Sequence, residues 1–150
     1  MKAADVMTRG VATCRTDDTA ADAARVMWDR DCGVVPVVDA QGALRGVVTD
    51  RDLLMAAHMQ GKSPADLRLS ALIPGPVATC REDSDVESIL TTMANRQIRR
   101  LPVLDRDNRV VGIVSINDLA LHALGDERHM KQLAKTLAAI SRHRELAATT

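Results

Sequence analysis

The sequence predicts a mixed α/β (α+β) protein made of two copies of one β-α-β-β-α unit. The copies are expected to pack about a pseudo-twofold axis, and an extra helix follows them at the C-terminus. The first observation is an internal repeat: residues 11–53 align with residues 77–119 without a gap, with 15 identities in 43 positions. The second is that each copy has a helical apolar pattern followed by two apolar runs joined by a turn. Such a repeat marks a duplicated structural unit, so a site in one copy predicts a twin in the other.

The composition is that of an ordinary globular domain. Lys plus Arg equal Asp plus Glu at 20 each, and Trp28 is the single aromatic residue. Single-strand nucleic-acid binders stack bases on aromatic side chains, so that class is not expected. No stretch approaches the roughly 18 consecutive apolar residues of a membrane helix, and the first residues lack the apolar run of a signal peptide. We therefore expect a cytoplasmic protein with no nucleic-acid or membrane partner, and three cysteines fit a reducing compartment.

The first copy begins with a short strand at residues 11–14. A helix follows, because apolar residues recur at the spacing i, i+3, i+4, i+7, namely Ala20, Ala23, Ala24 and Met27. Residues 34–38 are apolar throughout, as expected for a strand covered on both faces. Turn residues at 39–42 join this strand to a returning strand at 44–49, after which a second helix begins at Asp50.

The second copy repeats this order 66 positions later. The apolar face of its first helix consists of Val86, Ile89, Leu90 and Met93. Ser84, followed three residues later by Glu87, predicts a capping box at the start of that helix. Strands are expected at residues 101–104 and 110–115, and the last helix of the copy is expected to begin at Ile116.

The changes of pattern divide the chain into a first copy at 6–60, a linker at 61–71, a second copy at 72–124 and a C-terminal segment at 125–150. A short helical patch is expected near residues 65–72 of the linker and the start of the second copy. The C-terminal segment lies outside the repeat and contains basic residues, which are Lys131, Lys135, Arg142 and Arg144. Its apolar residues have helical spacing and are Met130, Leu133, Ala134, Leu137 and Ala138. This helix is expected to pack on the pair or to dock a second subunit.

The clearest candidate for binding chemistry is a motif found once in each copy, at Gly46–Asp52 and at Gly112–Asp118. It reads glycine, two apolar residues, Thr or Ser, two variable residues and aspartate. The pattern predicts a strand that ends where a helix begins, and helix N-termini bind phosphate through unpaired N–H groups. The hydroxyl can donate to that phosphate, and the aspartate can accept both hydroxyls of a ribose.

A structural interpretation of the same motif stays open. Thr49 with Asp52, and Ser115 with Asp118, also fit capping boxes in which aspartate replaces the usual glutamate. A carboxylate bonded to its own helix start needs no ligand. The recurrence of the motif in both copies, together with the rest of the repeat, favours a nucleotide site.

With these motifs the chain resembles the cystathionine-β-synthase (CBS) domain family. The resemblance covers residues 6–56 and 72–124. It rests on the Thr-Cys-Arg of the first strand, the amphipathic helix, the apolar-Pro-Val string and the glycine-to-aspartate motif. It implies two tandem CBS-domain repeats that fold as a pair and commonly dimerise. It also implies a sensor for an adenosine-containing ligand such as AMP, ATP or S-adenosylmethionine.

The resemblance further implies which residues line two clefts between the copies. The first cleft would combine Thr49 and Asp52 with Ala78, Ile98, Arg99 and Arg100. The second would combine Ile113, Ser115 and Asp118 with Ala12, Cys32 and Gly33. Arg99 and Arg100 replace Gly33 and Val34, so we expect the Asp52 cleft to favour a phosphorylated ligand. The Asp118 cleft is then expected to be weaker, empty or suited to a less charged ligand. Solvated surface charge is the alternative for both arginines.

The sequence thus predicts a regulatory module rather than an enzyme. No nucleophile–base pair, metal-ligand spacing or P-loop supports catalysis, so no catalytic residue, metal or cofactor is expected. We expect a homodimer that binds AMP, ADP, ATP, NAD or S-adenosylmethionine as a regulatory ligand and signals in trans to a protein target. One alternative is a ligand-free dimeric interaction or stress protein whose motifs only cap helices. Another is a thiol or metal sensor using Cys14, Cys32 and Cys80, although buried cysteine usually acts as a small hydrophobe.

Overall fold

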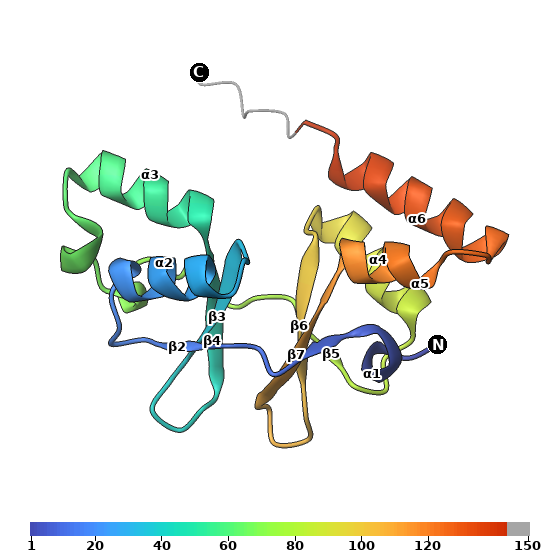
Figure 1. The fold of residues 1–150 in the computed structure, drawn as a ribbon, viewed down its shortest axis with the longest axis horizontal. Helices are drawn as coiled ribbons and strands as arrows, with labels where there is room; N and C mark the ends of the chain where they lie inside the picture. Colours follow the sequence, from blue (N-terminus) through green and yellow to red (C-terminus); the bar gives the residue numbers. More distant parts are fainter. Residues whose placement is uncertain (144–150) are drawn as a thin grey trace.

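The computed structural model describes residues 1–143 and has two halves that lie side by side, each with a small sheet and its helices (Figure 1). The first half contains β2 (Cys14–Arg15), α2 (Ala20–Asp29), β3 (Val34–Val38), β4 (Leu44–Thr49) and α3 (Asp50–Gln60). Its sheet has the order β2-β3-β4. The predicted strand at 44–49 and the helix start at Asp50 are confirmed. The first strand of the repeat lies at Cys14–Arg15 rather than at residues 11–14.

The second half contains β5 (Cys80–Arg81), α4 (Val86–Arg96), β6 (Arg100–Leu104), β7 (Val110–Ser115), α5 (Ile116–His122) and α6 (Glu127–Ile140). Its sheet has the order β1-β7-β6-β5, where β1 is Thr8–Arg9. The predicted strand at 110–115 and the helix start at Ile116 are confirmed. The predicted apolar face of α4 is also confirmed, because all four of its residues are buried.

The two hairpins share one register. Val34 pairs with Thr49 across β3 and β4, and Arg100 pairs with Ser115 across β6 and β7. Each hairpin also has a register shift at the same place, after Val37 in the first half and after Val103 in the second. The mixed α/β fold with two repeated units, predicted from the sequence, is therefore present.

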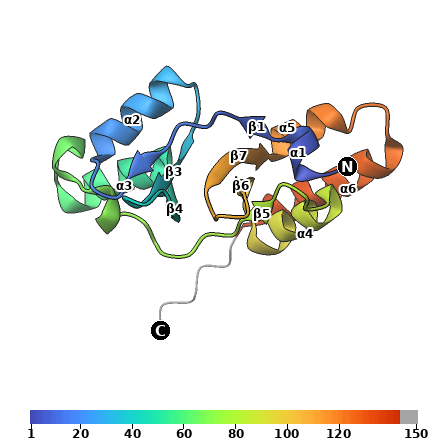
Figure 2. The same cartoon turned by 90° about the horizontal axis from the view of Figure 1, so that it is seen from below.

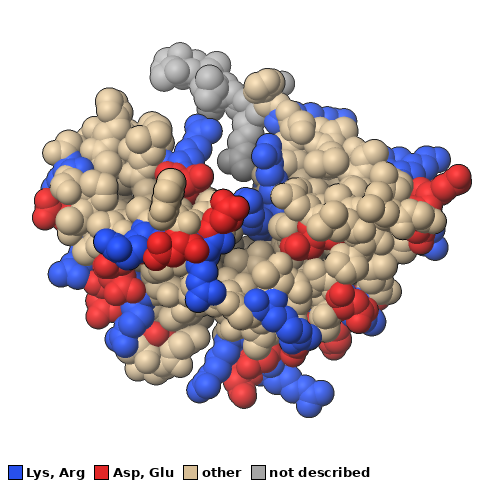
Figure 3. Space-filling model, in the orientation of Figure 1, with Lys and Arg blue, Asp and Glu red and all other residues tan. Residues whose placement is uncertain are grey.

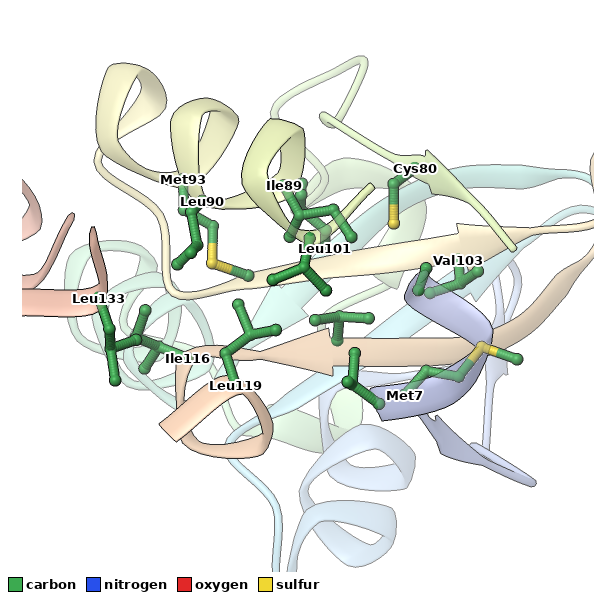
Figure 4. Close-up of a cluster of buried hydrophobic side chains, with 14 of the residues drawn as sticks. Met7, Cys80, Ile89, Leu90, Met93, Leu101, Val103, Ile116, Leu119 and Leu133 are labelled. Carbon is green, nitrogen blue, oxygen red and sulfur yellow. The ribbon is translucent and has the colours of Figure 1, made fainter. Parts of the chain in front are cut away.

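The N-terminal segment belongs to the second half, not to the copy that follows it. Strand β1 pairs antiparallel with β7, with Thr8 opposite Ile113. Helix α1 (Ala3–Val6) and Met7 contribute to the second hydrophobic core, where Met7 lies beside strand β7 (Figure 4). Residues 1–9 thus pack as part of the second half, although the boundaries drawn from the sequence assign residues from 6 onward to the first.

The linker packs on the first half in the same way. We call the N-terminal segment and the linker the exchanged segments, because each packs on the half that does not follow it in the chain. The linker forms two 3-10 turns, η1 (Pro64–Asp66) and η2 (Leu69–Ala71), in place of the single helical patch expected near 65–72. Leu67 and Leu69 are buried in the first core. Figure 2 shows both crossings, with the N-terminal segment along one side of the molecule and the linker along the other. Each crossing segment forms an isolated antiparallel β-bridge, Lys2 with Asp85 and Thr19 with Arg68. These two bridges are related by the same shift of 66 residues.

The motif glycines make room for these crossing segments. A Cβ at Gly112 would lie 2.7 Å from the Met7 sulfur and 2.8 Å from the Thr8 carbonyl oxygen. A Cβ at Gly46 would overlap the side chain of Ile73, which lies 66 residues after Met7 and is its counterpart in the repeat. Glycine is required there because another segment of the chain approaches the strand closely.

The capping box predicted from Ser84 and Glu87 is wrong. The N-cap of α4 is Asp85, and its side chain makes no capping hydrogen bond. The Ser84 hydroxyl instead accepts from the backbone N–H of Arg81 at 2.9 Å, and Glu87 forms an ion pair with Arg128 of α6 at 2.7 Å. The N-terminal segment takes over part of the capping, because the Val86 N–H donates to the Met1 carbonyl at 3.1 Å.

Helix α6 packs on α4 and α5 through a face that differs from the predicted stripe. Leu133 is buried as predicted, but its buried partners are Thr136 and Ile140. Met130 and Leu137 are 42% and 41% exposed, and Ala134 and Ala138 are exposed as well. The predicted basic residue Arg144 and the tail at 145–150 lie outside the described residues.

No helix within residues 1–143 is both long enough and apolar enough to span a membrane.

Candidate ligand-binding clefts

Both motifs form the capping box that the structural interpretation anticipated. In the first half, one carboxylate oxygen of Asp52, Oδ2, accepts from the Thr49 backbone N–H at 2.8 Å. The Asp52 N–H donates to the Thr49 hydroxyl at 3.2 Å. In the second half the corresponding distances between Ser115 and Asp118 are 2.7 and 3.1 Å. The Ser115 hydroxyl also donates to Asp118 Oδ2 at 2.6 Å.

The cap uses one oxygen of each carboxylate. An ionised carboxylate has two oxygens that each accept more than one hydrogen bond, so capping leaves Oδ1 free to accept another donor. In the second half, Asp118 Oδ1 accepts a hydrogen bond from the hydroxyl of Thr8, a residue of the N-terminal segment, at 3.3 Å. Capping and ligand binding are therefore compatible at this residue.

A cleft with a volume of about 360 Å³ opens at Asp118. Four parts of the chain line it: residues 8–12 of the N-terminal segment, residues 30–32 with the first residue of β3, the first residue of β6, and the junction of β7 with α5. Of the residues predicted for this cleft, five do line it, which are Ala12, Cys32, Ile113, Ser115 and Asp118. Its size lies within the range of pockets that hold small ligands, roughly 300–1,000 Å³.

Gly33 lies elsewhere, in an exposed groove of the first half with Trp28 and Asp50, and Val34 lines the cleft in its place. The Asp50 carboxylate lies over Gly33, where a Cβ would be 3.1 Å from Oδ2. The other Asp50 oxygen accepts from the Arg51 N–H at 2.8 Å.

The Asp118 cleft is more cationic than the sequence suggested. Arg9, Arg30 and Arg100 line it together with the carboxylates of Asp31 and Asp118. Figure 3 shows basic side chains gathered where the two halves meet. Arg100 was expected on the Asp52 side, but it lies directly opposite Ser115 in the β6–β7 ladder and lines the cleft beside that residue. Strand pairing explains the difference, because register places Arg100 at the Asp118 junction.

The other residues predicted for the Asp52 cleft are distributed differently. Arg99 lines a second hollow, of about 270 Å³, beside α5 and the end of α6. Ala78 and Ile98 are partly buried against the core of the second half. Thr49 and Asp52 remain at the β4–α3 junction, joined by their cap.

The cysteines have two different environments. Cys14 and Cys80 are buried, and burial raises the pKa of each thiol to about 11. Both therefore stay protonated near neutral pH and pack as small apolar side chains. Cys32 is partly exposed and lines the Asp118 cleft. Within residues 1–143 there is no group of three or more His, Cys, Asp or Glu side chains placed to hold a metal ion.

Sequence reasoning missed the contribution of Thr8, Arg9 and Gly10 to the cleft. A signal for it exists in the repeat. Shifted by 66 residues, Ala3, Val6 and Met7 fall on Leu69, Leu72 and Ile73, so the apolar pattern continues upstream of residue 11 although the identities stop. Extending the repeat in this way predicts that both segments pack alike, each against the opposite half.

Comparison with known proteins gives consistent results. The family model described as "CBS domain" matches residues 3–58 and 70–125. The CBS domain-containing protein YhcV of Bacillus subtilis is 36% identical over 123 residues, which cover 82% of this chain and 86% of that protein.

Two solved structures are similar over most of their length. The crystal structure of Hypoxic Response Protein I with two coordinated zinc ions has a TM-score of 0.75 and 30% identity, covering 81% of this chain and 98% of that one. The CBS domain pair of protein MJ0100, solved in complex with 5-methylthioadenosine and S-adenosyl-L-methionine, has a TM-score of 0.72 and 26% identity, with the same coverage.

Proposed function

The chain belongs to the CBS domain family, and from that premise we propose that it is a regulatory module that binds an adenosine-containing ligand in the Asp118 cleft. CBS domain pairs are in general regulatory and non-catalytic. The similarity to the MJ0100 pair, whose structure contains two adenosine-containing ligands, supports this ligand class.

The observation that carries the proposal is the arrangement at Asp118 Oδ1. This oxygen is not used by the helix cap and belongs to a residue that lines the cleft. It accepts a hydrogen bond from the Thr8 hydroxyl at 3.3 Å. A ribose hydroxyl can donate in the same way. The walls at Val11, Ala12 and Val34 offer an apolar surface suited to a base.

The charge of the cleft favours an anionic ligand. Arg30 and Arg100 both line it, and neither takes part in an ion pair among residues 1–143. Arg9 is engaged by Glu82 at 3.3 Å, at an exposed position where such a pair is weak. Guanidinium groups bind phosphate in a forked geometry, so AMP, ADP and ATP fit the cleft better than uncharged adenosine derivatives.

The twin motif at Thr49 and Asp52 is the candidate for a second site. Its cap has the same geometry, and Asp52 likewise has one oxygen outside the cap. The stoichiometry of ligand binding distinguishes one site from two.

A bound ligand would change how the two halves of the chain are positioned relative to each other. The cleft is lined by the exchanged segment, by the first half and by the second half, so one bound molecule contacts all three. A ligand shifts a conformational equilibrium only by its difference in affinity for the two states, and a site at a junction supplies that difference. We propose that the change is passed in trans to a protein target by a homodimer of this chain.

The capping geometry supports a rival function. If the motifs serve only as caps, the protein is a dimeric scaffold that binds no nucleotide. The observation in its favour is that both carboxylates already bond their own helix starts.

Calorimetric titration of nucleotide-free protein with AMP, ADP, ATP, NAD and S-adenosylmethionine separates the two functions. Asp118→Ala is expected to lower nucleotide affinity at least tenfold, because a hydrogen bond to a charged group contributes about 1.5–3 kcal/mol. Asp22→Ala is the matched control: Asp22 forms the same box with Thr19, at 2.8 Å, at the start of α2. If wild-type protein binds none of these ligands and both variants lose melting temperature, the motifs are caps and the scaffold function holds. If wild-type protein binds a nucleotide and Asp118→Ala leaves the affinity unchanged, the ligand does not contact Asp118.

A further inference from the structure

The groove between α2 and α3 of the first half is open among residues 1–143, although its counterpart in the second half is covered by α6. We propose that this groove is the docking site for an amphipathic helix of the protein target, with Lys or Arg at the end that lies over Asp31 and Asp50. This inference rests on the proposed function, because it names the kind of partner to which the regulatory module passes its signal. The groove has a volume of about 480 Å³.

The second half shows that a helix fits at this place. A shift of 66 residues carries the groove residues Ala24 and Leu53 onto Leu90 and Leu119. Those two leucines line one small hollow together with Leu133 of α6, and all three are buried. The residues that form the groove in the first half are thus covered by a helix in the second.

The same correspondence holds at the end of the groove. Asp31 lies 66 residues before Gln97, and both have a left-handed backbone, with φ of 49° and 51°. The Gln97 side chain donates to the carbonyls of Ala139 and Arg142, in the last turn of α6 and just after it, at 3.1 and 3.2 Å. Asp31 therefore stands where the end of a docked helix would lie, and its carboxylate accepts hydrogen bonds instead of donating them.

The charge of the groove indicates a basic partner. Asp31 and Asp50 are the only charged residues among residues 1–143 that line it, and both are exposed. Neither carboxylate takes part in an ion pair within this part of the chain. In the second half the uncharged residues Gln97 and Ile116 stand at these two positions. Two carboxylates at one end of an apolar groove favour a helix with Lys or Arg in its last turn, where basic residues also stabilise the helix itself.

The described part of the chain supplies no helix of its own for this place. The counterpart of α6 is residues 61–74, which leave α3 and form the linker instead. Leu67 and Leu69 of the linker are buried in the first core. Trp28 is left 88% exposed at the groove. Its indole offers a large apolar contact surface, and Trp is enriched among the residues that contribute most to protein interfaces.

The groove adjoins the Asp118 cleft. Asp31 and Cys32 line both of them. The Asp50 N–H donates to the Gly33 carbonyl at 3.2 Å, which joins the same segment to the start of α3. A ligand in the cleft and a helix in the groove would therefore contact one short segment, residues 31–33. Two molecules that bind to one element can alter each other's affinity, and the factor is the same in both directions.

Fluorescence of Trp28, the single Trp of the chain, tests the proposal on the whole protein. The probe is a synthetic peptide of residues 126–143, the sequence of α6, with Ser141→Lys to provide the basic end. Ser141 was chosen because it lines a hollow with Ile116, the counterpart of Asp50. The peptide contains no Trp, and its binding is expected to shift the Trp28 emission to shorter wavelength in a saturable way. The same peptide with Ser141→Glu is expected to bind at least about fivefold more weakly.

Variants of the protein sharpen the test. Asp50→Asn is expected to reduce the difference between the two peptides to about twofold, because it removes one of the two carboxylates. Ala24→Arg is expected to weaken binding of the lysine peptide at least about tenfold, because it places a cation in the groove. Ala24 is exposed, so this variant is expected to fold. Asp107→Asn removes a carboxylate from an exposed turn of the second half and is the control, with both affinities expected to stay unchanged.

Addition of nucleotide tests the connection to the Asp118 cleft. Saturating AMP is expected to change the affinity of the lysine peptide at least about fivefold, a typical size for coupling between two sites. An unchanged affinity in protein that binds AMP overturns the coupling through residues 31–33.

The outcomes separate the two proposals. No shift of Trp28 emission with either peptide, or equal affinities for the lysine and glutamate peptides, overturns the docking site and leaves the proposed function intact. A shift that develops with protein concentration in the absence of peptide means that a second copy of the chain covers the groove, which also overturns the docking site. Peptide binding by protein that binds no adenosine-containing ligand overturns the proposed function and supports the docking site as part of a scaffold.

Discussion

In both halves a strand ends at a hydroxyl residue three residues before an aspartate, and a helix begins directly after that hydroxyl residue, but the surroundings of this junction differ. At Ser115 the neighbouring strand begins with Arg100, whereas at Thr49 it begins with Val34. The backbone register is the same in the two halves because buried positions such as Val48 and Val114 occupy equivalent places in the cores. Charge differs because it lies outside the cores, where packing places little restriction on it.

The halves also differ in what covers them. Helix α6 lies on α4 and α5, while the groove between α2 and α3 is open and leaves Trp28 88% exposed. An element outside the repeat has therefore made one half distinct from the other. Three kinds of substitution test this comparison. They weaken the packing of α6, add a methyl group at the two motif glycines, and place a charge on the exposed faces of α3 and α5.

The largest effect is expected at Leu133, which anchors α6 and is 5% exposed. Leu133→Ala should lower the free energy of unfolding by about 3 kcal/mol, through lost burial and the cavity that remains. Lys135→Ala is the control, because Lys135 lies exposed on the same helix, and a change within about 0.5 kcal/mol is expected. Urea unfolding measures both. A small effect at Leu133 would mean that α6 is not held on the second half in solution.

The exchanged segments are tested at the two motif glycines. Gly112→Ala is expected to cost about 2 kcal/mol, because the new methyl group meets the Thr8 carbonyl oxygen, a backbone atom that cannot move alone. Gly46→Ala is expected to cost less, since its obstacle is the side chain of Ile73, which can adopt another rotamer. Urea unfolding of the two variants gives the order, and an equal or reversed order contradicts this account of the crossings.

Sequence reasoning succeeded where a local pattern determines the structure. The helix starts at Asp50 and Ile116 followed from the motif itself, and the strands at 44–49 and 110–115 followed from apolar runs with turn residues before them. These features depend on residues close together in the chain, so the pattern contains the required information.

It failed where distant segments compete for the same groups. Ser84 and Glu87 satisfy the pattern of a capping box, but Glu87 forms an ion pair with Arg128 instead. The Met1 carbonyl accepts a hydrogen bond from the first N–H of α4. The burial of Thr136 rather than Ala134 in α6 depends on how that helix lies across α4, where the Thr136 hydroxyl meets the Leu90 carbonyl oxygen at 3.5 Å. The position of Arg100 in the site depends on strand register, which no single segment specifies.

The smallest expected effect concerns the proposed homodimer, for which we infer an interface on helices α3 and α5. Helices α3 and α5 are equivalent and expose apolar side chains at matched positions, Met55 at 41% and Leu121 at 70%. Leu54 and Met59 of α3, 69% and 77% exposed, and Leu124, 72% exposed just after the end of α5, extend these patches. A twofold dimer pairs a surface with itself, and a repeated apolar patch suits that requirement.

A charge placed in the patch tests this interface and compares the halves directly. Leu121→Glu is expected to raise the dimer dissociation constant about tenfold, because it removes apolar contact and buries a charge at the contact surface. Met55→Glu should have a similar or smaller effect, since Met55 is less exposed. Ser88→Glu adds the same charge to an exposed position of α4 and should leave dimerisation unchanged. Sedimentation equilibrium measures all three. Equal weakening by Leu121→Glu and Met55→Glu would indicate that both halves contribute alike, whereas an effect of Ser88→Glu alone would place the interface on α4.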